Sequence, residues 1–216
     1  MSINVLLADD HTIVRNGLAS LLKAADDITV VGDAADGRAA VQEVQRLEPD
    51  VVVMDIAMPE LNGIEATKQI CETLPSTRIV ILSVYATLDH ISLALKAGAK
   101  GYLLKGSAAG EVIDAIRTVN AGHYYLSHEI ADAVIKDYVQ ESKDTRCDGL
   151  LSSLSSRERE IVQMVVEGKS NSEIAAILGL ATTSVAIYRG RLMKKLGAKD
   201  LPSLVKLAIQ HGLTAL

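Results

Sequence analysis

Val51-Val52-Val53-Met54-Asp55 joins four consecutive apolar residues to an aspartate. A short run that is rich in β-branched residues is typical of a strand that is buried on both faces of a sheet. Similar runs occur on either side of it in the sequence, at Ile3–Ala8, Ile28–Val31, Ile79–Leu82 and Gly101–Leu104. The first part of the chain therefore predicts five buried strands.

The segments between these runs have a helical period. Apolar residues recur in them three and four positions apart, which is the spacing of amphipathic helices. These segments cover Val14–Ala24, Arg38–Leu47, Ile64–Leu74, Ile91–Ala97 and Val112–Val119. Strands that alternate with helices over short connections predict an α/β fold, a doubly wound five-stranded parallel sheet with helices on both faces.

The pattern changes after residue 121. A helix is predicted over Glu129–Val139, and the stretch from Glu141 to Gly149 is polar and aperiodic, which favours an interdomain linker. We expect a first domain over residues 1–121, a linker with a helix over 122–150, and a smaller all-α domain over 151–216.

Two helix starts in the last of these parts carry the S-x-x-E capping pattern. Ser155 is followed by Glu158 and Ser170 by Glu173, so each serine and each glutamate can satisfy an amide at a helix start. Gly179 suits the tight turn between the second of these helices and the next. This order of elements predicts a helix-turn-helix.

The helix after this turn is expected to carry many cations. Thr182 or Thr183 can cap its start, and Gly197 can end it. A last helix is expected from Pro202, whose ring suits a first helical turn, to Gln210. The cations of the earlier helix can neutralise DNA phosphates and make binding salt-dependent; they are Arg189, Arg191, Lys194 and Lys195.

The composition is that of a globular chain, with 49% hydrophobic and 23% charged residues. No apolar run approaches the roughly 18 residues that a membrane span needs, and the N-terminus enters Val5-Leu6-Leu7 without a basic segment or a cleavage site. We therefore expect a cytoplasmic protein with no membrane partner. Cys71 and Cys147 are far apart and have no other metal ligand near them, so we expect two unpaired thiols.

The formal charge is divided unevenly along the chain. Residues 1–120 carry −6, residues 121–150 carry −3 and residues 151–216 carry +4, within a total of −5. An acidic body joined to a basic end is expected where only one domain meets a polyanion.

Polar side chains follow the predicted strands. Asp9 and Asp10 end the first strand and Asp55 ends the third, while Ser83 ends the fourth and Lys105 follows the fifth. Because the carboxyl ends of parallel strands meet at one edge of the sheet, we expect these five groups to lie together. Three crowded carboxylates repel one another unless a cation joins them, and such hard oxygen ligands suit Mg²⁺. One carboxylate could then attack a phosphoryl group while Lys105, Ser83 and the ion neutralise its oxygens.

The motifs around these residues resemble the receiver domain of two-component response regulators, over about residues 1–120. The resemblance rests on Ala8-Asp9-Asp10-His11, Val53-Met54-Asp55-Ile56-Ala57-Met58-Pro59, Leu61-Asn62-Gly63, Ile81-Leu82-Ser83 and Gly98-Ala99-Lys100-Gly101-Tyr102-Leu103-Leu104-Lys105. It implies a flavodoxin-like receiver fold, with a sensor histidine kinase as the phosphoryl donor and Asp55 as the phosphoacceptor.

The same resemblance assigns roles to the neighbouring residues. Asp9, Asp10 and Asp55, with the backbone carbonyl of Ala57, would hold Mg²⁺. Ser83 and Lys105 would sense the phosphoryl group, and Tyr102 would be the aromatic residue that moves with it.

Residues 151–216 resemble the LuxR-type helix-turn-helix of the NarL/FixJ class of regulators. The matching residues are Leu154 to Glu158, Glu167 to Ala175, Leu178-Gly179-Leu180, and Val185 through Gly197. The resemblance implies binding to double-stranded DNA through positions Lys169, Thr183, Ala186, Ile187, Arg189, Gly190, Arg191, Lys194 and Lys195. Ala186 and Ile187 could touch thymine methyl groups, and further sequence preference would come from Arg189 or Arg191 or from DNA shape.

The last helix carries an apolar stripe formed by Leu204, Val205, Ala208 and Ile209. Such a stripe can pack into the core of its own domain or form a dimer seam, and the family dimerises through this helix, so we expect both roles. A two-fold dimer would bind paired half-sites about one helical turn apart.

Other functions fit the sequence less well. A phosphatase that turns over on Asp55 needs a general acid two residues later, where Ala57 stands. A dinucleotide-binding domain needs a G-x-G-x-x-G motif after the first strand, which is absent. A constitutive DNA binder with a vestigial receiver is a third alternative. The sequence leaves open whether activation uncovers a recognition helix or pairs the receivers.

Overall fold

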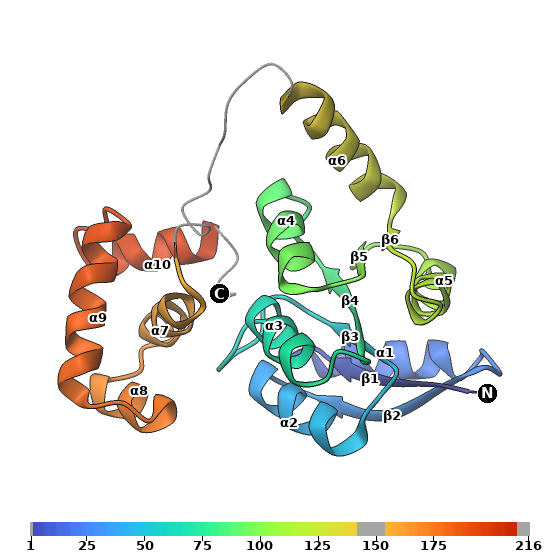
Figure 1. The fold of residues 1–216 in the computed structure, drawn as a ribbon, viewed down its shortest axis with the longest axis horizontal. Coiled ribbons are helices and arrows are strands. Elements are labelled where there is room, and N and C mark those ends of the chain that lie inside the picture. The colour runs from blue at the N-terminus through green and yellow to red at the C-terminus, as the bar shows by residue number, and fades with distance from the viewer. Residues whose placement is uncertain (1, 142–153, 211–216) are drawn as a thin grey trace.

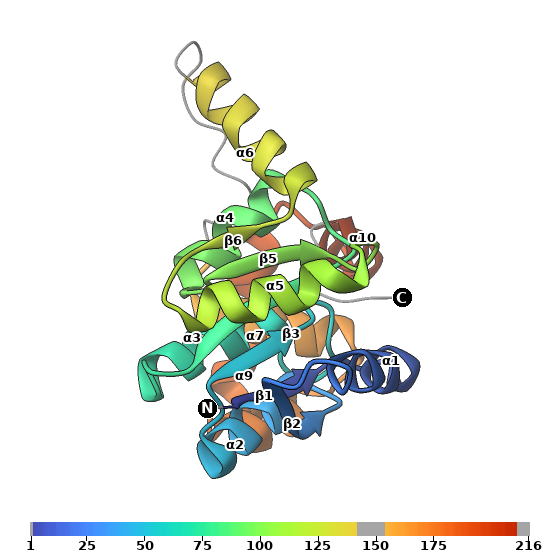
Figure 2. The same cartoon turned by 90° about the vertical axis from the view of Figure 1, so that its right-hand side faces the viewer.

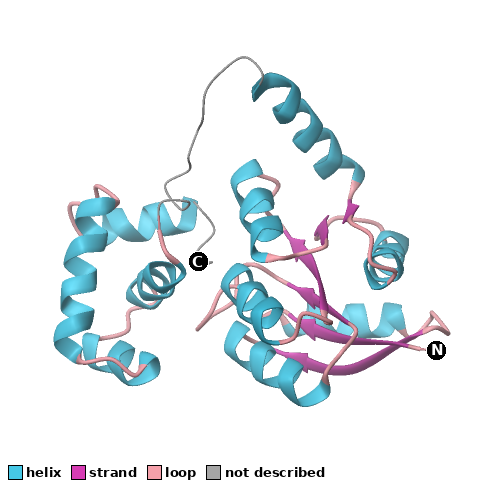
Figure 3. Ribbon diagram, in the orientation of Figure 1, coloured by secondary structure: helices cyan, strands magenta, loops and turns pink. Residues whose placement is uncertain are grey.

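The computed structural model describes residues 2–141 and 154–210. Its first part is a parallel sheet with helices on both faces, which confirms the predicted α/β class (Figures 1 and 3). The strands run in the order β2-β1-β3-β4-β5-β6, and every neighbouring pair is parallel. Their bounds are β1 Ile3–Ala8, β2 Ile28–Ala34, β3 Val51–Met54, β4 Arg78–Ser83, β5 Gly101–Leu104 and β6 Tyr125–Leu126.

Within residues 2–141 and 154–210 the sheet has six strands, so the prediction of five was wrong. The additional strand, β6, has only two residues, and two residues are too few to display a strand period. It pairs with β5 through Gly101 and Tyr102. The sheet thus extends into the segment that we expected to be a linker.

Helices cover the two faces of the sheet in two groups. On one face, α1 (Thr12–Leu22) and α5 (Ala109–Asn120) pack on alternate strand residues such as Val51 and Val53 (Figure 2, where α5 faces the viewer). On the other face, α2 (Gly37–Leu47), α3 (Gly63–Thr73) and α4 (Leu88–Ala97) pack on the intervening residues, such as Val52 and Met54. Because side chains alternate along a strand, the continuous apolar run of β3 is explained by burial on both faces.

The helix expected before the linker is α6, His128–Glu141. Its buried Ile130 belongs to the same core as α3 and α4, and α6 contacts α4. Most of the polar stretch that we expected as the linker, together with Cys147, lies outside the described residues.

The C-terminal part is helical and has a core of its own, formed by residues such as Ile161, Val185 and Leu204. Both predicted capping boxes are present, at the starts of α7 (Ser156–Val166) and α8 (Asn171–Leu178), and Gly179 ends α8 in the left-handed region. The last two helices are α9 (Thr182–Lys195) and α10 (Leu201–Gln210).

One predicted cap was wrong. The N-cap of α9 is Ala181, which makes no side-chain cap, so neither Thr182 nor Thr183 caps this helix. A cap that lacks a side-chain oxygen leaves no signal in the sequence, which is why the start was placed one or two residues late. Among the described helices, none combines the length and the apolarity needed to cross a bilayer.

Two glycines allow close packing around the loop that follows β3. A Cβ atom on Gly63 would lie 1.8 Å from the backbone oxygen of Asp55, and one on Gly37 would lie 1.9 Å from that of Leu61. No rotation of a side chain can relieve a clash with a backbone oxygen. The starts of α2 and α3 can therefore approach this loop only where Cβ is absent.

Gly63→Ala should separate α3 from the end of β3 and lower the free energy of unfolding by about 1–3 kcal/mol or more, as overpacking does. Chemical denaturation of the full chain measures this change. Gly17→Ala is the matched control, because a Cβ atom at Gly17 in α1 meets nothing within 4 Å. The control should be neutral or stabilising by up to about 1 kcal/mol, and an equal loss in both variants would contradict the packing explanation.

Candidate functional site

The carboxyl ends of β1, β3 and β5 bring charged groups together at one edge of the sheet. The Lys105 Nζ lies 2.8 Å from Oδ2 of Asp55 and 2.8 Å from Oδ2 of Asp9. Asp9 and Asp55 are almost fully buried, and Asp10 is partly exposed. Carboxylate oxygens of these three aspartates lie within 4.8 Å of one another and of a ring nitrogen of His11.

Asp55 is held in a polarised environment. Burial raises its pKa, and the hydrogen bond and charge of Lys105 oppose that shift without cancelling it. The second oxygen, Oδ1, accepts a hydrogen bond of 2.8 Å from the backbone N–H of Ile56. For Lys105, burial opposes the charge, but the hydrogen bonds to Asp55 and Asp9 outweigh it and raise the pKa of the ammonium. Lys105 therefore bridges Asp55 and Asp9, and Asp55 presents a carboxyl group that is almost fully removed from solvent.

The acidic group fits a small divalent cation. Within the described residues, Oδ1 of Asp10 is buried and accepts no hydrogen bond of adequate geometry, although Nδ1 of His11 lies 2.6 Å away. Nδ1 of His11 also lies 3.1 Å from Oδ1 of Asp9. Carboxylate oxygens in this number are the ligands that Mg²⁺ prefers. The contacts of His11 were not anticipated from the sequence, although it follows the aspartate pair directly.

Ala57 lies in the loop between β3 and α3, which spans residues 55–62, and it is nearly buried. The loop is closed on itself, because the N–H groups of Met58 and Gly63 both donate to the carbonyl of Ile56. Its last residue, Asn62, caps α3 through its side chain. The backbone carbonyl of Ala57 is thus carried by a short and well-fixed segment next to Asp55.

Ser83 and Tyr102 are joined to each other, and no direct hydrogen bond from either to Asp55 is found in the described part of the chain. Both side chains are fully buried. Burial raises the pKa of Tyr102, and a hydrogen bond to Ser83 opposes this shift. The Tyr102 hydroxyl donates to the carbonyl of Tyr85 at 2.7 Å, and the Tyr85 ring stacks on His90 of α4 with centroids 4.6 Å apart. Hydrogen bonds therefore connect the end of β4 to Tyr85, and ring stacking connects Tyr85 to α4.

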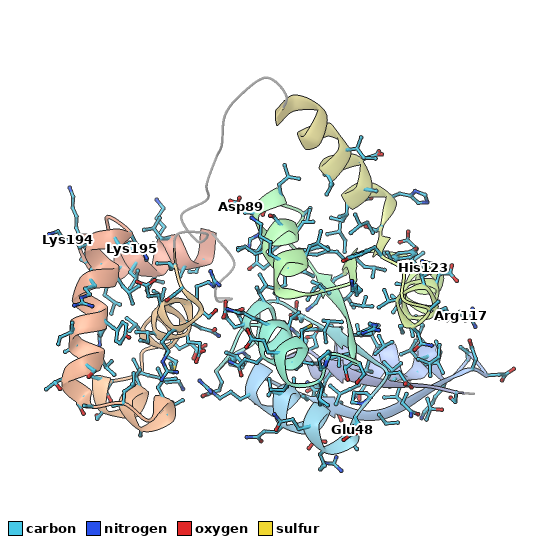
Figure 4. All side chains as sticks on the ribbon, in the orientation of Figure 1. Glu48, Asp89, Arg117, His123, Lys194 and Lys195 are labelled. Atoms are coloured by element: carbon cyan, nitrogen blue, oxygen red, sulfur yellow. The ribbon has the colours of Figure 1, made fainter. Side chains whose placement is uncertain are left out.

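The outer face of α9 is open. Ile187 is 57% exposed, and the residues around it on this face are exposed as well, while Val185 and Leu192 anchor the opposite face in the core. The exposed positions are Thr183, Ala186, Ile187, Gly190, Arg191 and Lys194. Figure 4 shows Lys194 at the end of α9 pointing away from the rest of the protein.

The predicted DNA-contacting cations differ in their surroundings. Arg191 and Lys194 are exposed, and neither forms an ion pair with another described residue. Arg189 donates to Oδ1 of Asn171 at 2.7 Å, and Lys195 donates to Oε2 of Glu158 at 2.9 Å. Lys169 precedes α8, and its Nζ lies 2.7 Å from Oε1 of Glu60 in the first domain.

Several interdomain contacts were missed by the analysis of the sequence. The side chain of Gln163 on α7 bonds to the loop of residues 55–62, and Arg159 of α7 forms an ion pair with buried Glu65 of α3. The feature of the sequence that could have indicated these contacts is Gln163, a polar residue in the otherwise apolar stretch of α7 from Ile161 to Val166. A sequence cannot say what such a residue faces.

The apolar stripe of α10 is divided between two surroundings. Leu204 and Ala208 are buried in the core of their own domain. Val205 and Ile209 lie on the outer side and line a groove of about 490 Å³ together with Leu201, Pro202 and Lys206. The outer pair is thus the part of the stripe that remains available to another molecule.

Comparisons with known proteins agree with both parts of the structure. Residues 5–117 match the response regulator receiver domain, and residues 152–208 match the bacterial regulatory proteins of the luxR family. The chain is similar to the transcriptional regulatory protein MctR of Rhizobium johnstonii, at 37% identity over 99% of this chain and 96% of that protein. It is also similar to the response regulator UvrY of Escherichia coli, at 38% identity over 98% and 95% of the two chains.

A solved structure of two RcsB dimers bound to two parallel DNAs has the same fold, with a TM-score of 0.59 and 25% identity over 96% of this chain and 98% of that chain. Both domains and their order along the chain are matched by these relatives. The chain therefore belongs to the two-component response regulators of the NarL/FixJ class, which are DNA-binding transcription regulators that join a receiver domain to a LuxR-type helix-turn-helix.

Proposed function

We propose that Asp55 accepts a phosphoryl group from a sensor histidine kinase in a Mg²⁺-dependent reaction, and that this modification controls how the protein binds promoters. The observation that carries the proposal is the contact of Lys105 with both Asp55 and Asp9, at 2.8 Å in each case. A buried carboxylate that is polarised by an ammonium, beside two further carboxylates, suits phosphoryl transfer.

The chemistry follows from the groups around Asp55. An oxygen of Asp55 attacks phosphorus, forms an acyl phosphate and releases the histidine nitrogen of the kinase. Asp9, Asp10, Asp55 and the carbonyl of Ala57 would hold Mg²⁺, which supplies neutralisation of the negative oxygens during transfer. Lys105 stays within reach of the Asp55 oxygens and offsets the added charge. Ser83, at the adjacent strand end, offers a hydroxyl to the phosphoryl group.

The response to phosphorylation would run along the path from Ser83 to α4. When the Ser83 hydroxyl bonds to a phosphoryl oxygen, its bond with Tyr102 changes, and Tyr102 is tied to Tyr85 and through it to His90. A local change of charge can thereby shift a two-state element of the receiver.

The exposure of α9 favours pairing of two molecules over uncovering of the recognition helix. In Figure 1, α7 lies between α9 and the receiver, and the outer face of α9 is exposed while the two domains are in contact. We therefore propose that phosphorylation promotes a homodimer on double-stranded DNA, with Val205 and Ile209 of α10 at the seam. The solved structure of two RcsB dimers bound to two parallel DNAs supports binding to DNA as a dimer. A DNA target and a kinase partner imply that the protein works in the cytoplasm. The receiver would extend beyond the expected limit at residue 121, because β6 and Ile130 of α6 pack with it, and the DNA-binding domain would begin near residue 151.

Asp55→Asn tests the proposal directly. With a small-molecule phosphodonor and Mg²⁺, the native protein should be labelled on Asp55 and should gain DNA affinity and dimer content. The variant should show neither change, measured by mass spectrometry, DNA binding and analytical ultracentrifugation. A gain of DNA affinity by the variant under phosphodonor would refute phosphorylation control through Asp55.

Lys105→Met should raise the pKa of Asp55 further. The native pKa is already above its ordinary value because of burial, and Lys105 opposes this rise more strongly than the backbone N–H of Ile56 does. The acid limb of phosphorylation, which requires the ionised carboxylate, should accordingly move to higher pH. Carbon NMR titration of the Asp55 carboxyl without Mg²⁺ measures the change, with exposed Lys23→Met as the control. An unchanged or lowered pKa would contradict this role of Lys105.

Arg191→Ala should weaken binding to specific and non-specific DNA and reduce the salt slope of affinity by about one unit, as expected for the loss of one phosphate contact. Arg191 is exposed on α9, so folding should be unaffected. Arg46→Ala on α2 of the receiver removes the same exposed charge far from α9 and should leave both quantities unchanged. Titrations at several salt concentrations separate these outcomes, and an equal effect of both substitutions would contradict a phosphate contact at Arg191.

A further inference from the structure

Gln163 of α7 is fully buried, and its side-chain amide has all of its hydrogen-bonding positions filled. Oε1 accepts from the backbone N–H of Asn62 at 2.8 Å and from Nδ2 of Asn62 at 3.2 Å. Nε2 donates to the carbonyl of Met58 at 2.8 Å and to Oε1 of Glu167 at 2.9 Å. Two acceptor and two donor positions are all that such an amide possesses. Three of these four bonds go to the receiver loop of residues 55–62.

This loop begins at the phosphoacceptor. Ala57, whose carbonyl is a proposed Mg²⁺ ligand, directly precedes Met58, and Gln163 holds the loop at Met58 and again at Asn62. The loop is also closed by the bond from Gly63 N–H to the Ile56 carbonyl at 2.8 Å. A shift of the Ala57 carbonyl toward a bound cation would carry Met58 along and strain its bond to Gln163.

Further contacts keep α7 against the receiver around this loop. Arg159 pairs with the buried carboxylate of Glu65, and Nζ of Lys68 donates to Oγ of Ser156 at 2.6 Å. Lys169 pairs with Glu60, whose backbone has a φ of 64°. A left-handed conformation is unusual for a glutamate and persists where its surroundings hold it in place. The docked domain thus touches the loop at three of its residues: Met58, Glu60 and Asn62.

We propose that Gln163 is a positioning residue that fixes this loop in the arrangement in which Lys105 bridges Asp9 and Asp55, so that docking of α7 and Mg²⁺ binding oppose each other. The inference rests on the proposed function of the Asp55 pocket. Asp9, Asp10, Asp55 and the Ala57 carbonyl would hold the cation, which would supply the charge compensation that Lys105 now provides, and any movement of the Ala57 carbonyl toward it would work against the bond from Gln163 to Met58. Binding linkage is reciprocal, so Mg²⁺ and the phosphoryl group weaken docking by the factor by which docking weakens them.

The coupling does not depend on covering the recognition helix, since the outer face of α9 is exposed while Gln163 is bound to the loop. The DNA-binding domain acts here on the receiver rather than only receiving a signal from it.

Gln163→Met in the full chain tests the proposal, because methionine keeps the volume of the side chain and removes all four hydrogen bonds. Mg²⁺ alone, titrated by calorimetry, should bind about fivefold more tightly than to the native protein, at the low end of ordinary coupling factors. Amide hydrogen exchange at Asn62 and Gly63 should accelerate. Gln45→Met makes the same chemical change at an exposed position of α2 and should alter neither quantity.

Gln163→Glu provides a second variant, whose polar side chain can be hydrated when the two domains separate. It can still accept from Asn62 but cannot donate to Met58, so it should also bind Mg²⁺ more tightly. In the native protein, Mg²⁺ with beryllofluoride, a phosphoryl mimic, should increase the radius of gyration in small-angle scattering.

The outcomes distinguish this inference from the proposed function. If the native protein takes up Mg²⁺ and is labelled on Asp55 while both Gln163 variants bind Mg²⁺ with native or weaker affinity, the coupling is refuted and the proposed function stands. If the native protein takes up neither Mg²⁺ nor the phosphoryl group, the proposed function itself fails. Tighter Mg²⁺ binding in both variants, with faster exchange confined to the loop, supports the coupling.

Discussion

Repulsion among three carboxylates at one edge of the sheet is the constraint on which the rest of this protein depends. Parallel strands bring Asp9, Asp10 and Asp55 together whether or not their charges are compensated. Lys105 provides that compensation by standing between two of them, and burial keeps the attraction strong. A cation or a phosphoryl group that enters the pocket must consequently change the ion pairs that Lys105 forms with Asp9 and Asp55.

The elements around the pocket explain how such a rearrangement can travel. On one side, Ser83, Tyr102 and Tyr85 link the strand ends to α4. On the other side of the pocket, the loop of residues 55–62 leads from Asp55 to α3 and is hydrogen-bonded to Gln163 on α7 of the second domain. Gly37 and Gly63 allow α2 and α3 to pack closely against this loop, so the loop has little room to move without moving its neighbours. Both routes are short; the contacts of Gln163 with the loop are buried, and those through Tyr85 are partly buried.

Most of the sheet could be predicted from the sequence, because runs such as Val51–Met54 carry the mark of burial on both faces. The charged edge could also be predicted, since strand polarity places Asp9, Asp55 and Lys105 at the same end. The two-residue β6 lacked a period, and the start of α9 lacked a capping side chain. Contacts between the domains were beyond prediction, because the hydrogen bonds of Gln163 join residues about one hundred positions apart and depend on how two separate cores meet.

The division of charge between the two ends of the chain has a consequence for the approach to a duplex. The residues up to 150 carry −9 and those from 151 carry +4. In Figure 1 the acidic receiver lies on the far side of α7 from α9. The molecule is thus an electric dipole, and the field of a polyanion such as DNA orients it so that α9 faces the DNA. This effect acts within a screening length of about 8–10 Å at physiological ionic strength. Encounters in which the receiver, and not α9, faces the DNA therefore become rarer, independently of the DNA sequence.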